Sequence, residues 1–298
     1  MTRKPGRSGL RWMIPQVAVP LMMLLAGAVS GAETSATSGA DIATSEPDAA
    51  YEVAVAAYAE SDYATALKGF RALAERHHPG AWFHLGLMHQ YGQGLAADAT
   101  AAARLYRLAA EREHSSAQLS LALLYHQGQG VPQDHEAAAR WCRRAAELGL
   151  AGAQVTLALM YQEGEGVPQD HAEAASWFRQ AAEQDHPSAQ LSLALLYLQG
   201  LGVEEDPAQA AAWCRRAAEQ GLDSAQFTLA LMLQQGRGVA QDDIAAHMWA
   251  SLAAASSADP EAIGLLESLE AKMSPSQIAE ARQRSEQWKP AAPAAPRQ

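Results

Sequence analysis

Four histidines lie close together in the sequence and raise the question of a metal site. They are His77, His78, His84 and His89. Zinc sites combine His, Cys and carboxylate ligands at characteristic spacings, such as two histidines four residues apart on one helix. These histidines do not show such a spacing, and no Cys or Asp accompanies them. We therefore expect no metal site, and the sequence indicates no cofactor.

Hydroxyl side chains recur with a strict spacing. A nucleophile that is repeated four times without a base beside it is best interpreted as a surface residue. The recurring residues are Ser120, Thr156, Ser192 and Thr228. We predict no catalytic residues.

Pairs of arginines could bind an anionic partner. Arg143-Arg144 is one such pair, and Arg215-Arg216 is another. Each pair has a glutamate, Glu147 or Glu219, within one helical turn. Solvated ion pairs along the helix are therefore the favoured interpretation.

Glycine pairs of the form Gly-x-Gly could cradle a phosphate group. Each pair follows a helical segment rather than a strand, and each lacks the third glycine of the dinucleotide-binding pattern. A helix-ending role is favoured, because glycine adopts the left-handed conformation without steric cost. The second glycine, such as Gly130, is expected to loosen the turn.

The spacing of these pairs is the main signal in the sequence. They recur every 36 residues without an insertion, and a fixed period of this size is the signature of a stacked-repeat architecture. The first glycines of the five pairs are Gly92, Gly128, Gly164, Gly200 and Gly236.

Each repeat is predicted to be a helical hairpin. Before Gly128, apolar residues at spacings of three and four indicate one helix. Asp134 is expected to cap the next helix, which carries Ala138, Trp141 and Ala145 on its buried face. A single hairpin cannot bury both of its apolar faces, so the units must stack.

The two cysteines occupy the same repeat position. Cys142 and Cys214 lie two repeats apart. Stacked hairpins are separated by about 10 Å each, whereas a disulfide needs Cα atoms within about 7 Å. We expect both to be unpaired, buried side chains.

These motifs resemble the Sel1-like repeat, a longer relative of the tetratricopeptide repeat. The resemblance rests on Ala-x-x-x-Leu-Ala/Gly-x-x-Tyr, Gly-x-Gly-Val-x-x-Asp and Ala-x-x-Trp-x-x-x-Ala-Ala-Glu-x-Gly. It implies an all-α fold, a right-handed α-solenoid of helix-turn-helix repeats with capping helices at both ends. The five repeats are expected at 79–114, 115–150, 151–186, 187–222 and 223–258.

The segments outside the repeats have different predicted roles. Residues 1–32 combine a basic start, an uncharged apolar run and small residues at the end, which indicates a signal peptide. A retained membrane anchor is the alternative. Residues 33–48 read as a disordered leader, 49–78 as a tetratricopeptide-like hairpin, 259–288 as capping helices and 289–298 as a disordered tail.

The charge disfavours nucleic acid and anionic lipid as general partners. The chain has 22 basic and 33 acidic residues, a net charge of −11. Loss of the four basic residues in 1–32 leaves 18 against 33, or −15. We expect a monomeric protein that is either periplasmic or secreted in a bacterium. We expect it to have no contact with the membrane once the signal peptide is removed.

The predicted partner-binding site is an apolar row on the first helix of each repeat. In tetratricopeptide-like stacks this helix lines the concave side. The row is either buried by tight winding of the stack or binds a partner segment. It comprises Phe83, Leu87, Leu119, Leu123, His126, Val155, Leu159, Leu191, Leu195, Phe227 and Leu231.

The function expected from these features is an exported, non-enzymatic scaffold or regulator that binds a protein partner in its concave groove. The family resemblance implies partners such as a sensor kinase ectodomain, a cell-wall enzyme or an exopolysaccharide export complex. The alternatives are a cell-wall or β-lactam hydrolase of the Sel1-like type, and a membrane-tethered assembly factor for envelope or exopolysaccharide machinery.

Overall fold

The computed structural model describes residues 47–257 and 259–290, which form helices and no strand. The predicted signal peptide at 1–32 lies outside the described residues. So do nearly all of the predicted leader and most of the predicted tail.

The described residues form consecutive antiparallel helix pairs. The first helices of the five repeats are α4 (Pro79–Tyr91), α6 (Ser115–Gln127), α8 (Ala151–Glu163), α10 (Pro187–Gln199) and α12 (Asp223–Gln235). The second helices are α5 (Ala99–Ala110), α7 (His135–Glu147), α9 (His171–Glu183), α11 (Pro207–Glu219) and α13 (Asp243–Ser257). The pair α2 (Pro47–Ala59) and α3 (Tyr63–Glu75) precedes them, and α14 (Pro260–Glu270) and α15 (Pro275–Gln287) follow.

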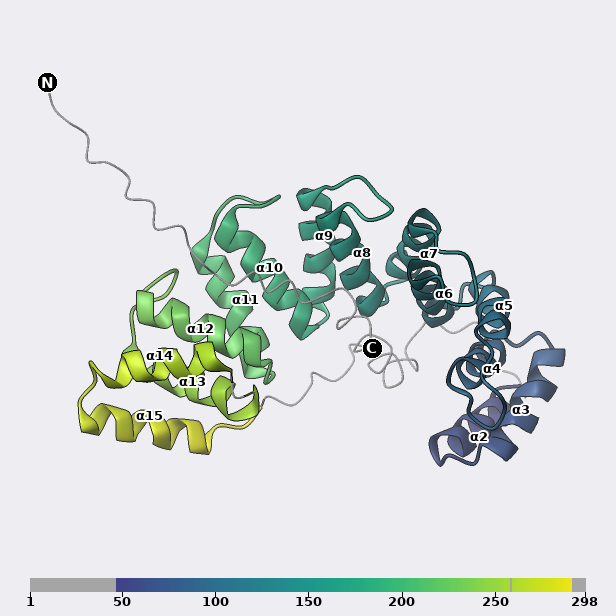
Figure 1. Ribbon diagram of the computed structural model, residues 1–298, viewed down its shortest axis with the longest axis horizontal. Helices are drawn as coiled ribbons and strands as arrows, with labels where there is room; N and C mark the ends of the chain where they lie inside the picture. The colour runs from purple at the N-terminus through teal and green to yellow at the C-terminus, as the bar shows by residue number, and fades with distance from the viewer. Residues whose placement is uncertain (1–46, 258, 291–298) are drawn as a thin grey trace, which may run out of the picture.

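The helix pairs follow one another along an arc from α2 and α3 to α14 and α15 (Figure 1). Each first helix packs on the second helix of its own repeat and on the second helix of the repeat before it. This nearest-neighbour packing is that of an α-solenoid, as predicted.

The predicted helix ends are confirmed. The first helix of each repeat ends at a glycine in the left-handed conformation, with φ between 65° and 75°. Asp134 Oδ1 accepts a hydrogen bond from the backbone N–H of Ala137 at 2.8 Å. The same cap recurs at Asp98, Asp170, Asp206 and Asp242.

The second glycine of each pair has a different role from the one predicted. A Cβ on Gly166 would lie 2.0 Å from the carbonyl oxygen of His135, at the start of α7. The same clash with the preceding repeat would occur at Gly130, Gly202 and Gly238. These glycines do not loosen the turn. They let it rest directly on the backbone of the preceding repeat.

The core runs along the whole stack and is built from alanines and larger apolar residues. The prediction that the tryptophans lie on the buried face is only partly correct, because Trp141, Trp177 and Trp213 are half-buried. The residue after each tryptophan position is fully buried instead: Tyr106, Cys142, Phe178, Cys214 and Ala250. The buried face of α7 is therefore centred on Cys142, one residue after Trp141.

Both cysteines are free and buried, as expected. Each thiol donates a weak hydrogen bond to a backbone carbonyl of the next helix, Cys142 to Ala153 and Cys214 to Ala225. Burial raises the pKa of the Cys214 thiol to about 12 and raises that of Cys142 further. Both thiols are therefore held in the neutral, unreactive form.

Candidate functional site

The predicted apolar row is largely interior. Seven of its eleven side chains are buried: Phe83, Leu87, Leu119, Leu123, Val155, Leu159 and Leu191. The remaining four, His126, Leu195, Phe227 and Leu231, are partly buried. Of the two possibilities that the sequence left open for the row, burial holds for every apolar residue of the row in the first three repeats and for Leu191 in the fourth.

A shared core explains this burial. Leu119 and Leu123 of α6 belong to the same core cluster as Val155 and Leu159 of α8, together with alanines of α7. Every residue of α8 from 153 to 160 is buried. A helix that is apolar all round is a buried helix.

A half-exposed part of the row remains near the C-terminal end of the stack. Leu195 of α10, and Phe227 and Leu231 of α12, pack against one core cluster and are only partly buried. Leu195 and Leu231 occupy the same position in consecutive repeats. The three side chains together form what we call the apolar strip.

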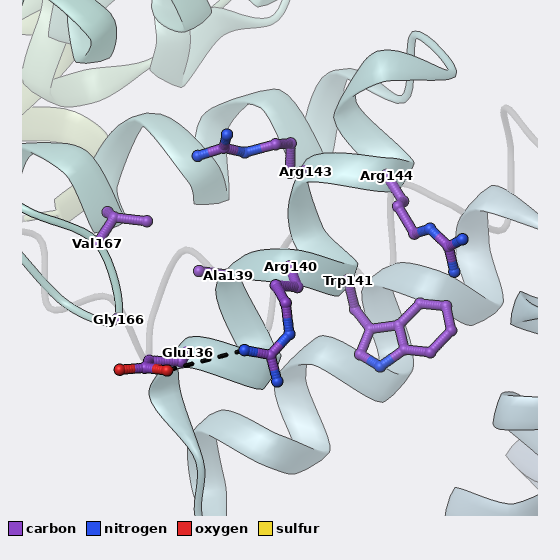
Figure 2. A pocket seen from close by; sticks show the side chains of 8 residues that line it. All are labelled: Glu136, Ala139, Arg140, Trp141, Arg143, Arg144, Gly166 and Val167. Carbon is purple, nitrogen blue, oxygen red and sulfur yellow. Dashed lines mark ion pairs between the residues drawn. The ribbon is translucent and has the colours of Figure 1, made fainter.

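A second surface feature is a basic hollow of about 550 Å³ between α7 and the turn that follows α8. Figure 2 shows Arg140, Arg143 and Arg144 projecting from α7, with Val167 of that turn on the opposite side. Arg140 pairs with Glu136 at 3.8 Å, and both side chains are well exposed.

The arginine pairs do not form the ion pairs that the sequence suggested. The Arg143 guanidinium lies 5.6 Å from the ring centroid of Tyr161, and that of Arg144 lies 5.0 Å from the ring centroid of Trp141. Arg216 contacts Trp213 and pairs with Asp185. Within the described residues, the carboxylates of Glu147 and Glu219 form no salt bridge with them. Aromatic faces, rather than the neighbouring glutamates, hold these guanidinium groups.

The recurring hydroxyls are not surface residues. Ser120 and Thr156 are buried, and Ser192 and Thr228 are partly buried. The Thr156 hydroxyl donates to the carbonyl of Gly152 at 2.8 Å, one helical turn earlier. A hydroxyl bonded to its own helix backbone in this way has a structural role.

The four histidines near the first repeat do not form a metal-binding group within the described residues. His78 caps α4, where its Nδ1 accepts from the N–H of Ala81 at 3.2 Å. His84 stacks on Phe70, with ring centroids 4.7 Å apart. His114, the last residue of the first repeat, caps α6 in the same way that His78 caps α4.

Sequence reasoning missed a different cluster. His126, His135 and Glu165 come from two repeats and lie within reach of one another. The spacing of these residues in the sequence matches no known ligand pattern. Only their positions within the repeats could have indicated the cluster.

The Sel1 repeat family matches this chain in five consecutive stretches, which together span more than half of it. These stretches are residues 81–114, 115–150, 151–186, 187–222 and 223–257. The chain belongs to the Sel1 repeat family.

The chain is also similar to solved structures, of which the first named here shares its fold. A Sel1 repeat protein from Oxalobacter formigenes is 27% identical, with a TM-score of 0.70 over 80% of this chain and 100% of that chain. A protective antigen with an SLR fold, present in uropathogenic Escherichia coli strains, is 23% identical, with a TM-score of 0.40 over 91% and 82%. A Sel1 repeat protein from Klebsiella pneumoniae is 21% identical, with a TM-score of 0.42 over 67% and 97%. No curated protein matches the sequence.

The Sel1 repeats are flanked by helices outside the matched stretches. At the C-terminal end, α15 starts with the predicted capping box of Ser274 and Gln277, and Trp288 packs edge-on against Trp249 of α13. Across the described residues, none of the helices is both long and apolar enough to span a bilayer.

Proposed function

We propose that this chain is an exported, non-enzymatic scaffold or regulator that binds a protein partner through its Sel1 repeats. The observation that carries the proposal is the apolar strip of Leu195, Phe227 and Leu231 on the first helices of consecutive repeats. Half-exposed apolar side chains on neighbouring repeats offer a continuous surface to an apolar partner segment.

The strip fits the spacing of a helical or extended segment. Leu195 and Leu231 occupy equivalent positions in adjacent repeats. Their separation therefore follows from the spacing of packed helices, which is about 10 Å between axes. A partner helix that presents apolar residues one or two turns apart would contact both leucines. We therefore propose the C-terminal part of the predicted row, and not the full row, as the binding site.

The strip is tested by placing charge on it. We expect the double variant Leu195→Glu and Leu231→Glu to stay helical by circular dichroism, because both side chains already contact solvent. It should lose the partners that the unmodified protein captures from a periplasmic extract by crosslinking and mass spectrometry. Unchanged capture by a folded double variant would contradict a binding role for the strip.

The matched control places the same charges on the buried part of the row. Leu123→Glu with Leu159→Glu puts two carboxylates at positions that are only 8% and 6% exposed. Burial of an unpaired charge costs several kcal/mol. We expect this variant to lose helical signal and to melt at a lower temperature, whereas the strip variant keeps both.

Export is tested separately. Residues 1–32 are proposed to be removed on export, so the N-terminal sequence of the protein recovered from periplasm should begin at residue 33. A protein that retains these residues in the membrane fraction would support the tethered assembly factor instead. Turnover of a cell-wall or β-lactam substrate by the purified protein would contradict the non-enzymatic role.

A further inference from the structure

Three side chains that could bind a metal ion meet where the second repeat packs on the third. His126 lies in the last turn of α6, His135 is the first residue of α7, and Glu165 lies in the turn after α8. Their ligand atoms all lie within 4.8 Å of one another. The cluster therefore draws its side chains from two consecutive repeats.

The histidines are oriented for a shared interaction. His126 Nε2 lies 2.8 Å from Glu165 Oε2, and the two imidazole rings are 5.0 Å apart at an interplanar angle of 81°. The Nδ1 atoms of His126 and His135 are both buried, and neither has a hydrogen-bond partner among the described residues. A buried imidazole nitrogen without a partner calls for a ligand or a bound water.

The turn geometry of the repeats builds the cluster. Gly166 rests on the carbonyl of His135, and this contact places its neighbour Glu165 over the end of α6 and the start of α7. The other junctions have the same backbone contact but different side chains. The residues equivalent to His126, His135 and Glu165 are Gln90, Ala99 and Gln129; Gln162, His171 and Leu201; and Leu198, Pro207 and Arg237.

A second carboxylate lies next to the cluster in the sequence. Glu163 is the last residue of α8, two residues before Glu165. The site thus combines two imidazoles with two nearby carboxylates.

We propose that His126, His135 and Glu165 bind a divalent transition-metal ion, for which Zn²⁺ is the best match. Two histidines and one glutamate form a known three-ligand zinc set, which leaves the fourth tetrahedral position for water or another donor. Zinc bonds of about 2.0–2.1 Å place tetrahedral ligand atoms about 3.3 Å apart. The His126 to Glu165 distance must therefore open slightly from 2.8 Å, which surface side chains allow.

Zinc would act as a clamp between repeats. Binding to ligands from two repeats stabilises their interface without changing either hairpin, and stability in a solenoid depends on such interfaces. Glu165 is 37% exposed and His126 is 15% exposed, so an ion can reach the cluster from solvent.

The experiment is calorimetric titration of Zn²⁺ into the protein purified without a histidine tag. We expect one ion per chain, and a fall in affinity of at least tenfold for His126→Gln, His135→Gln and Glu165→Gln. Cobalt substitution should give the visible absorption of a tetrahedral site, which is lost in the same variants. Zinc should also raise the melting temperature of the unmodified protein.

The matched control is His171→Gln. His171 occupies the position of His135 in the next repeat and has the same unpartnered Nδ1, but Gln162 and Leu201 replace its companions. This variant should bind zinc as the unmodified protein does. The proposal fails if the folded, unmodified protein does not bind zinc, if the three cluster variants bind it equally well, or if binding is lost on replacing His77 and His78 instead.

Discussion

His114 caps α6 through a side chain that must be unprotonated. Its Nδ1 accepts from the backbone N–H of Ala117 at 3.2 Å, and its ring stacks on Phe83. Burial, followed by the proximity of His84 and His78, lowers the pKa of His114 to about 4. Burial also lowers the pKa of His84 and His186. These residues tie the stability of the stack to pH.

The pH dependence has a defined direction. The unfolded chain takes up a proton on His114 as the pH falls below about 6.5, whereas the folded chain does so only near pH 4. Stability is therefore full above pH 6.5 and declines towards pH 4. We predict that His114→Leu, which copies Leu150 and Leu222 at the same repeat position, removes about 2 kcal/mol of the loss between pH 7 and pH 5. Urea unfolding at the two pH values measures this, and an unchanged difference between variant and parent would contradict it.

At the scale of the helix, buried glutamines join each repeat to the one before it. Gln154 of α8 donates to the carbonyl of Ala146 near the end of α7 at 3.2 Å and accepts from Gln184 at 2.8 Å. The donation to the preceding second helix recurs at Gln118, Gln190 and Gln226. Each bond gives a carbonyl at a helix end a second donor from the next repeat, beside the backbone N–H that it already accepts.

Loss of one such glutamine is expected to be costly. Gln154→Met has a similar volume but removes the hydrogen bond to the Ala146 carbonyl and the one from the Gln184 amide. The net contribution of a hydrogen bond is about 0.5–1.5 kcal/mol, so we expect a loss of about 1–2 kcal/mol. The control Gln129→Met changes an exposed residue and should cost less than about 0.5 kcal/mol. Equal unfolding free energies for the two variants would show that the glutamine bonds do not contribute.

At the scale of the whole molecule, the terminal helices cover the apolar face at the end of the stack. Helix α13 packs on both α14 and α15. This contact buries Ala246, Trp249, Ala250 and Ala253 on α13. Terminal units of a solenoid need a polar outer face, because the apolar face of the last repeat has no further repeat to cover it.

Removal of the last two helices should therefore expose an apolar end. We predict that deletion of residues 259–298 causes self-association in size-exclusion chromatography and faster hydrogen exchange in α12 and α13. Exchange in α4 to α9 should change little, since interactions in a solenoid are between neighbours. Deletion of 291–298 alone leaves every described helix intact and serves as the control. Uniformly faster exchange along the chain would argue against this local coupling.

The sequence by itself determined the repeat, the hairpin, the helix ends and the unpaired cysteines. Each of these depends on short-range rules: a left-handed glycine after a helix, an aspartate before one, and a fixed period between copies. The capping box at Ser274 was predictable for the same reason.

Only the tertiary structure decided which side chains and backbone atoms surround each position of the repeat. Leu123 and Leu159 are buried because they belong to a core cluster that consecutive repeats share, and Gly166 is required because a turn lies against the preceding repeat. The cluster of His126, His135 and Glu165 likewise exists only across a junction. Periodicity shows which residues are equivalent, but burial and clustering depend on side chains about 36 residues away, whose distance is set by how tightly the stack winds.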